Sequence, residues 1–292
     1  MFKFNFPADN CDRTEPESTP EHISNELKSC VQEVEGREIE ITIDQHENVN
    51  QYRASGLPIT TVREFQLIDV KHVEQFLSTN EAEHFESLRT ALQKNSDVIS
   101  GVYEGGLKVW ECTIDLLDYL EKNQLQFNEQ NVLDLGCGAG LLGIFALKQG
   151  ASSVHFQDYN AEVLELVTIP NVILNEPKNA KGKTKFFAGD WGSLITKLDS
   201  YDVILTSETI YNPENYSKLL SIFEKTIKKN GVIYVAAKHH YFGVGGDLHE
   251  FESLLRRDGQ WTTSICFCSS EGPFLIDGVK REIMKIVRST IL

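Results

Sequence analysis

The chain has 292 residues, of which 41% are hydrophobic, and its 43 acidic and 28 basic side chains give a net charge of −15. This length suits one large domain with an extension, while the acidic balance argues against nonspecific nucleic-acid binding and favours either solubility or recruitment of a basic protein. No apolar run approaches the roughly 20 residues of a membrane span, and the N-terminus lacks a signal-peptide pattern, so we expect an intracellular protein.

The first 95 residues are predicted to form an acidic N-terminal extension, followed by the main domain at residues 96–292. Residues 7–50 are rich in polar side chains and poor in aromatic ones, so they bury little surface and are expected to be partly disordered. From Ser78 to Leu92, good capping residues precede Phe85, Leu88 and Leu92 at helical spacing, which predicts one amphipathic helix.

After about residue 100, apolar runs alternate with helical segments, which predicts an α/β fold with a parallel, doubly wound sheet. Helices are expected near residues 114–120, 141–148, 161–174, 214–229 and 248–256. Seven strands are expected, at residues 132–135, 154–157, 185–188, 203–206, 232–236, 261–268 and 280–287.

Residues 132–143 read Val-Leu-Asp-Leu-Gly-Cys-Gly-Ala-Gly-Leu-Leu-Gly, the order of a strand, a glycine turn and a helix. Glycines allow the backbone to approach a ligand closely, and the amides at the start of a helix favour negative charge. The segment Gly138–Gly143 also matches the GxGxxG dinucleotide fingerprint. That frame would bury Asp134 inside the strand at a high cost, whereas a strand that ends at Leu135 leaves Asp134 at its tip. With Asp134 two residues before Gly136, the segment resembles the pattern associated with S-adenosylmethionine (SAM) methyltransferases, which favours SAM over a dinucleotide.

Two later turns complete a predicted nucleoside site. The strand at residues 154–157 leads to Asp158, whose carboxylate can accept both hydroxyl protons of a ribose. After the next strand, Asp190 offers an acceptor for an exocyclic amine and Trp191 offers an indole face for a purine, although a solvated loop with a core tryptophan explains the same residues.

Gly101–Thr113 is a glycine-rich approach to Trp110 and Glu111. The pattern suits either a lid over the site or a tryptophan that anchors the next helix. Ser207–Pro213, which reads Ser-Glu-Thr-Ile-Tyr-Asn-Pro, is a polar cluster at the tip of a buried strand, where α/β proteins place their chemistry.

The six cysteines include no Cys-x-x-Cys pair, so we expect reduced thiols with neither a zinc site nor a disulfide framework. His239 and His240 are adjacent, but neighbouring residues of a strand point to opposite faces and cannot easily share one ion. The sequence therefore predicts no metal.

Together these motifs resemble the seven-strand, Rossmann-like, SAM-dependent methyltransferases and, more narrowly, the protein-histidine N-methyltransferase family that modifies a large-subunit ribosomal protein. The similarity covers residues 101–292 and is carried by Gly101–Thr113, Val132–Gly140, His155–Asn160, Ser207–Pro213 and His240–Gly246. It implies SAM as the cofactor, with contacts from Val109, Trp110, Glu111, Cys112, Thr113, Gly136, Gln157, Asp158, Tyr159, Gly189, Asp190, Trp191 and Ser207.

The resemblance also implies a basic ribosomal protein as substrate, an effect on ribosome biogenesis or translation, and a location in the cytoplasm and nucleus. The default expectation is a monomer that does not bind nucleic acid directly.

The product of the resembled family is tele-methylhistidine, which requires an acceptor that holds the pros N–H of the imidazole. Our hypothesis is that Glu208 or Asn212 supplies this acceptor, with Tyr211 and His240 shaping the pocket. For Glu208, a helix cap or an ion pair is an equally good interpretation. Three other functions are weighed: methylation of a lysine or a small molecule by the same fold, a noncatalytic SAM-binding module that contacts ribosomal components, and a nicotinamide oxidoreductase.

Overall fold

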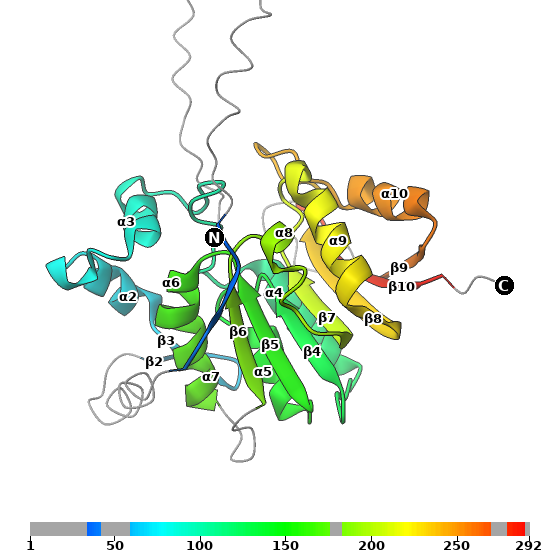
Figure 1. Ribbon diagram of the computed structural model, residues 1–292, viewed down its shortest axis with the longest axis horizontal. Helices are drawn as coiled ribbons and strands as arrows, with labels where there is room; N and C mark the ends of the chain where they lie inside the picture. The colour runs from blue at the N-terminus through cyan, green and yellow to red at the C-terminus, as the bar shows by residue number, and fades with distance from the viewer. Residues whose placement is uncertain (1–33, 42–58, 176–182, 270–278, 290–292) are drawn as a thin grey trace, which may run out of the picture.

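The computed structural model describes residues 34–41, 59–175, 183–269 and 279–289. Its centre is an eight-stranded, mostly parallel sheet with helices on both faces, so the predicted α/β fold is confirmed (Figure 1). Most of residues 7–50, for which partial disorder is expected, lie outside the described ranges. No helix in these ranges is both long and apolar enough to cross a membrane.

The strands follow the order β1-β6-β5-β4-β7-β8-β10-β9 across the sheet. Strands β4 to β8 are parallel to their neighbours within that group, whereas β10 is antiparallel to β8 and β9. The chain changes direction across the sheet between β4 and β7, and α/β proteins bind ligands beyond the carboxyl ends of the strands at such a point. The strands are β1 (Arg37–Ile39), β4 (Asn131–Leu135), β5 (Ser153–Asp158), β6 (Thr184–Ala188), β7 (Tyr201–Ser207), β8 (Ile227–Lys238), β9 (Trp261–Cys268) and β10 (Arg281–Arg288), and a separate hairpin pairs β2 (Ile59–Val62) with β3 (Phe65–Ile68).

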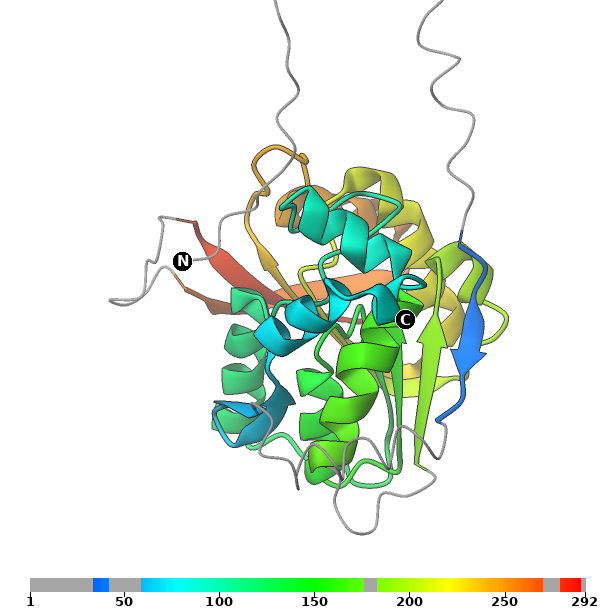
Figure 2. The same ribbon diagram turned by 90° about the vertical axis from the view of Figure 1, so that its left-hand side faces the viewer.

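All seven expected strands are present in the sheet, β1 adds an eighth from the N-terminal segment, and the β2–β3 hairpin adds two more outside this sheet. β1 pairs antiparallel with β6 and forms the edge of the sheet, as the blue strand in Figures 1 and 2 shows. Ile39 packs into the core, whereas the side chains of Arg37 and Glu38 are exposed. Three residues with one apolar side chain carry too little pattern to predict a strand.

The two hydrophobic cores lie on opposite faces of the sheet, and the alternation of side chains along the strands produces them. In β7, Val203 and Leu205 belong to one core and Ile204 to the other. The first core also holds the buried residues of α4, α5 and α7, and the second holds those of α9 and α10. The strands buried on both faces explain the continuous apolar runs in the sequence.

The helices largely follow the predicted segments. The helix expected at residues 214–229 ends earlier, because the chain enters β8 at Ile227. The helices are α2 (Val70–Leu77), α3 (Glu86–Gln93), α4 (Glu111–Lys122), α5 (Leu141–Lys148), α6 (Ala161–Val163), α7 (Ile169–Asn175), α8 (Trp191–Leu194), α9 (Tyr216–Thr226) and α10 (Leu248–Asp258), with 3-10 turns η1 (Asn80–Ala82) and η3 (Pro213–Asn215) and a π-helical turn η2 (Leu164–Thr168) between α6 and α7.

The prediction of one helix over residues 78–92 is wrong, because the structure has η1 and α3 with a break at Phe85. The break has a tertiary cause. The backbone amides of Ser87 and Leu88 donate to the Glu162 carboxylate at 3.2 and 3.3 Å, so a side chain from a distant helix satisfies the first turn of α3. Phe85 itself leaves the helical conformation and packs its ring against Phe76.

Residues 34–36, just before β1, brace the loop that follows β6. The Asp190 amide donates to the Val34 carbonyl at 3.0 Å, and the Gly36 amide donates to Ser193 Oγ at 2.8 Å. Gly189, at φ +121°, leaves no room for a side chain, since a Cβ there would lie 2.6 Å from the Gly36 Cα. The approach of these two backbones therefore requires glycine.

We predict that Gly189→Ala lowers the free energy of unfolding by about 2 to 3 kcal/mol, because it adds a backbone clash to an unfavourable φ. Gly245→Ala is the matched control, since Gly245 has φ +86° and a Cβ added there would meet nothing within 4 Å; it should cost about 1 kcal/mol. Urea denaturation measures both. An equal loss of unfolding free energy in the two variants would contradict the argument that contact with Gly36 excludes a side chain at position 189.

Candidate active site

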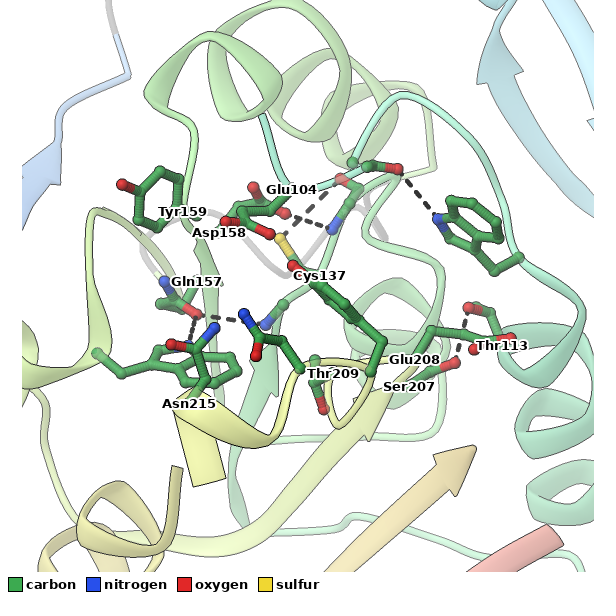
Figure 3. A pocket seen from close by; sticks show the side chains of 18 of the residues that line it. Glu104, Thr113, Cys137, Gln157, Asp158, Tyr159, Ser207, Glu208, Thr209 and Asn215 are labelled. Carbon is green, nitrogen blue, oxygen red and sulfur yellow. Dashed lines mark hydrogen bonds between the residues drawn. The ribbon is translucent and has the colours of Figure 1, made fainter. Parts of the chain in front are cut away.

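A pocket of about 350 Å³ lies at the carboxyl ends of β4, β5 and β7, within the size range of small-molecule sites (Figure 3). The structure brings most of the predicted site residues together in it. Those that line the pocket are Val109, Trp110, Thr113, Gly136, Gln157, Asp158, Tyr159, Asp190, Trp191 and Ser207 from the predicted cofactor set, and Glu208, Tyr211 and Asn212 from the predicted substrate set.

The glycine loop forms the floor of the pocket. Gly136, Gly138 and Gly140 have φ values of +66°, +48° and +77°, which side-chain-bearing residues rarely adopt. A Cβ on Gly138 would lie 3.2 Å from the Gly106 carbonyl oxygen, so the segment at 101–113 lies directly against the loop. Within this segment Trp110 donates its indole N–H to the Gly105 carbonyl at 3.0 Å and also lines the pocket.

Asp134 is buried, with 1% of its surface exposed, although the strand ends at Leu135 as predicted. The expectation that this strand end spares the carboxylate from burial is therefore wrong. The amide of Gly143 in the first turn of α5 donates to Asp134 Oδ2 at 2.8 Å and offsets part of the cost. Burial nevertheless raises the pKa of Asp134 to about 8.

Asp158 and Gln157 close the β5 side of the pocket. The Gly138 and Asn160 amides donate to the two Asp158 carboxylate oxygens at 3.0 and 3.1 Å, so backbone donors orient this side chain. Burial raises the pKa of Asp158 to about 6, and these hydrogen bonds oppose the rise. Gln157 accepts the Trp191 indole N–H at 2.9 Å and donates to the Gly189 carbonyl at 3.0 Å, which joins β5 to the loop after β6.

Asp190 serves the fold as well as the pocket that it lines. Its Oδ1 accepts the Gly192 amide at 2.8 Å as the N-cap of α8, and its Oδ2 pairs with Lys218 Nζ at 2.8 Å. The exocyclic amine of a bound purine would therefore have to share the Asp190 carboxylate with Gly192 and Lys218. Thr113 Oγ1 and Ser207 Oγ are 3.0 Å apart and link α4 to the tip of β7.

Glu104 is a pocket residue that the sequence reasoning missed. Its Oε1 accepts the Gly101 amide at 2.6 Å, while its buried Oε2 has no hydrogen-bond partner within the described ranges. Figure 3 shows it beside Asp158. Burial raises the pKa of Glu104 to about 7, and the Asp158 charge adds to the shift. The position of Glu104 in the glycine-rich segment was the one sequence feature that pointed to the pocket, but that pattern does not show that the carboxylate is buried.

Glu208, on the far side of the pocket from Glu104 in Figure 3, is 6% exposed and has φ +58°. The Tyr241 hydroxyl donates to its Oε2 at 2.6 Å, and the buried Cys112 thiol also bonds to the carboxylate, whereas its buried Oε1 has no nitrogen or oxygen donor among the described residues. Burial raises the pKa of Glu208, and the nearby Lys238 ammonium opposes this rise. Such strain at a buried, half-satisfied carboxylate is typical of functional positions.

Asn212 also lines the pocket, but its side-chain oxygen is already used. It accepts the Glu214 amide at 3.0 Å as the N-cap of η3. Tyr211 is 8% exposed, and its backbone carbonyl accepts the Gly246 amide at 2.9 Å. The connection between β8 and α10 is thereby held against this wall of the pocket.

Four predicted residues do not line the pocket. Glu111 pairs with Lys238 Nζ at 3.1 Å, Cys112 is fully buried, and Gly189 packs on Gly36. His240 is in the connection between β8 and α10, with Nδ1 3.5 Å from Asp247 Oδ2 and 43% of its side chain exposed. Cys112, Cys137, Cys266 and Cys268 are free thiols, in line with the sequence-based expectation for these four.

The pocket residues fit the cofactor that the sequence predicts. A glycine floor admits close contact with a ligand, and Asp158 and the unpartnered Glu104 oxygen offer anionic acceptors to hydroxyl or ammonium donors. The indole of Trp191 supplies an aromatic surface. Ser207 and Glu208 lie at the opposite side of the pocket (Figure 3).

Comparison with known proteins assigns the domain to a methyltransferase group. The sequence model of a family described as "Lysine methyltransferase" matches residues 89–252. The chain is 44% identical over 210 residues to "Histidine protein methyltransferase 1 homolog" of Bos taurus, covering 62% of this chain and 56% of that protein. The homologue of Mus musculus is 45% identical over 209 residues, covering 62% and 58%.

A third relative, "Histidine protein methyltransferase 1" of Schizosaccharomyces pombe, is 30% identical over 253 residues, covering 72% of this chain and 73% of that protein. The matches to the two mammalian proteins thus span less than two thirds of those proteins' length.

We predict that S-adenosylhomocysteine raises the melting temperature and that NAD does not, because only a ligand that binds the folded state stabilises it. At 100 times its dissociation constant the ligand should add about 2.7 kcal/mol. Differential scanning fluorimetry measures the shift. Asp158→Ala should reduce it strongly, and stabilisation by NAD alone would contradict the assignment.

We also predict that the free energy of unfolding falls as the pH rises from about 4.5 to about 7. Glu104 has a higher pKa in the folded state than in the unfolded chain, so the folded state holds more protons across this window. At pH 8, Glu104→Gln should be more stable than the wild type by about 1 to 3 kcal/mol and should show a flatter pH dependence. Urea denaturation at several pH values measures this. Glu214→Gln, at an exposed carboxylate on the rim, is the matched control and should leave the dependence unchanged.

Proposed function

Because the chain belongs to the methyltransferase family that includes the histidine protein methyltransferases, we propose that it transfers a methyl group from SAM to an imidazole nitrogen of a histidine in a protein. SAM is the methyl donor that membership of this family implies. The single observation that carries the choice of histidine is the buried Oε1 of Glu208, which lacks a nitrogen or oxygen donor among the described residues and belongs to a pocket residue.

Imidazole chemistry explains why such an oxygen is useful. A histidine side chain has a reference pKa of about 6.5, so at pH 7 it is mostly neutral and already has one nitrogen lone pair. Which nitrogen carries the lone pair depends on which N–H is held by an acceptor. In the proposal, Glu208 Oε1 accepts the pros N–H, so the tele nitrogen is free to attack.

Glu208 suits this role better than Asn212, the other residue considered from the sequence. The Asn212 oxygen already accepts the Glu214 amide, whereas the buried Glu208 Oε1 has no nitrogen or oxygen donor among the described residues, and the carboxylate has the Cys112 thiol as a weak donor. Within the described ranges Glu208 caps no helix and its Oε2 accepts the Tyr241 hydroxyl, while the charge of Lys238 keeps the ion-pair interpretation in part. The Lys238 ammonium favours the ionised form.

The electron balance of the step is simple. SAM bound in this pocket would supply a methyl group on a sulfonium; the C–S electron pair would go to sulfur as the tele nitrogen lone pair forms the new C–N bond. The imidazole then carries the positive charge. The Glu208 carboxylate stabilises this charge in a buried site, and the pros proton passes to Glu208 or to water when the product leaves. Trp110 and Thr113 bound the same pocket and restrict the orientations open to the imidazole.

Lysine is the second candidate acceptor, and the description of the matched family supports it. A lysine with a reference pKa of about 10.4 must lose a proton before its nitrogen can attack. A buried carboxylate next to an ammonium favours the charged form and so opposes that loss. The carboxylate raises the pKa of either acceptor, but lysine begins about 4 pKa units higher than histidine, so the carboxylate leaves lysine the harder acceptor to deprotonate.

We extend the proposal to a basic protein of the large ribosomal subunit as substrate, acting in the cytoplasm and nucleus. The family resemblance supports the ribosomal protein, and the net charge of −15 suits attraction to a basic partner. A monomer without direct nucleic-acid binding is the matching expectation.

We predict that Glu208→Gln lowers kcat with a protein substrate by about 100-fold or more, because the charge that stabilises the imidazolium is lost. The dissociation constant for S-adenosylhomocysteine, measured by calorimetry, should change less than about threefold and also reports that the variant is folded. Asn212→Ala should lower kcat by less than about tenfold. Wild-type kcat/KM in Glu208→Gln would refute the assignment.

The acceptor itself is identified by amino-acid analysis after incubation with radiolabelled SAM and large-subunit ribosomal proteins. We expect the label in tele-methylhistidine. Label in methyllysine would establish the second candidate, and label in the pros isomer would show that Glu208 holds the other nitrogen. Absence of labelled protein, with SAM binding intact, would favour a noncatalytic module.

A further inference from the structure

A cluster of two histidines and a buried carboxylate lies outside the pocket. His239 follows β8, His249 is in the first turn of α10, and Glu282 is in β10. One candidate ligand atom from each residue lies within 4.8 Å of the other two. Three separate elements therefore bring metal-binding groups to one point.

We propose that His239, His249 and Glu282 bind a divalent transition-metal ion, with zinc as the preferred occupant. Neutral imidazole and carboxylate are ligands that zinc favours, and three protein ligands with an open position is a common set. The sequence excluded an ion shared by His239 and His240, and the fold instead pairs His239 with a histidine ten residues further on.

Two of the three spacings between ligand atoms are close to those around a tetrahedral ion, and the third, between the two histidine nitrogens, is within 4.8 Å. Glu282 Oε2 lies 3.3 Å from His239 Nδ1 and 3.6 Å from His249 Nε2. Bonds of 2.0–2.1 Å in a tetrahedron place neighbouring ligand atoms roughly 3.3–3.5 Å apart. The two imidazole rings meet edge to face with centroids 4.5 Å apart, so both can direct a nitrogen towards the same carboxylate.

The ligands also have the outer partners that metal sites require. The other nitrogen of His249, Nδ1, lies 3.6 Å from Glu252 Oε2, so a carboxylate faces the nitrogen that is not directed at Glu282. Glu252 is fixed in turn by Arg256 at 2.9 Å and Thr263 at 2.7 Å. Lys280 Nζ holds the second oxygen of Glu282 at 2.7 Å, so the carboxylate has one oxygen for an ion and one for a counter-charge.

The carboxylate of the cluster is buried and its two histidines are partly exposed, which suits a site that an ion can reach from solvent. Glu282 is 4% exposed, whereas 38% of the His239 side chain and 46% of the His249 side chain are exposed. An ion can enter from solvent, and water can complete its coordination. Without an ion, the buried carboxylate has, among the described residues, Lys280 and the two imidazoles as its ion-pair partners.

A metal bound at this site would restrain the connection from β8 to α10, which borders the proposed acceptor pocket. Residues 239 and 249 are the two ends of the connection from β8 to α10, which carries Tyr241, the donor to Glu208, and Gly246, the donor to the Tyr211 carbonyl. A metal that joins both ends restrains this connection. It is a structural ion, since none of its ligands lines the pocket.

The test is zinc binding to the full-length protein after treatment with EDTA and dialysis, measured by competition with a chromophoric chelator at pH 7.5. We expect one equivalent of zinc with a dissociation constant of about 10 μM or tighter. His239→Ala and His249→Ala should each weaken binding at least tenfold, and magnesium should not compete. His72→Ala, a histidine on α2 far from the cluster, is the matched control and should bind like the wild type.

Two further measurements distinguish zinc bound at this cluster from zinc bound elsewhere or by cysteine thiolates. Zinc should raise the melting temperature of the wild type but not of His249→Ala, which removes a half-exposed side chain and should fold. Cobalt(II), used in place of zinc, should show no thiolate charge-transfer band, because no cysteine is in the cluster. An equivalent of zinc that survives both histidine substitutions, a thiolate band, or no binding tighter than about 100 μM would each overturn the proposal. None of these measurements depends on methyl transfer.

Discussion

Carboxylates buried at the tips of parallel strands, each held by backbone amides, are the constraint on which the site depends. Asp134 takes the Gly143 amide and Asp158 takes the Gly138 amide, so both acids bind the glycine loop and the helix that follows it. Burial raises the pKa values of these acids to about 8 and about 6, which means that the amide bonds only partly offset the cost. Burying these carboxylates costs stability, and it produces a pocket whose charged groups are oriented before any ligand binds.

The fold was largely predictable because its strands are buried on both faces and its glycine loop has a strict order. Runs such as Val132–Leu135 and Val203–Thr206 show strands without reference to any partner. What could not be predicted depends on distant contacts: β1 has three residues, and α3 begins where Glu162, 75 residues away from Ser87, supplies its cap. Local pattern contains no information about such partners.

The pocket shows the same division. Residues in the glycine loop and at strand tips were found from spacing, whereas Glu104 was missed because its significance comes from burial and from an oxygen without a partner among the described residues. The choice between Glu208 and Asn212 also needed the structure, since both carry an oxygen and only the hydrogen bonds distinguish them. The sequence predicts which polar side chains line the pocket, and the hydrogen bonds in the structure determine which of their oxygens already have donors.

The pairing of β1 with β6 has a consequence for the order of folding. Arg37 and Ala188 are partners although they lie roughly 150 residues apart, so this contact closes one of the longest loops in the chain and carries a large entropic cost. Contacts of this kind form late and open early, because little local structure supports three residues at an edge. We therefore expect the contacts of residues 34–36 with the loop at residues 189–193 to form late on folding and to open early on heating.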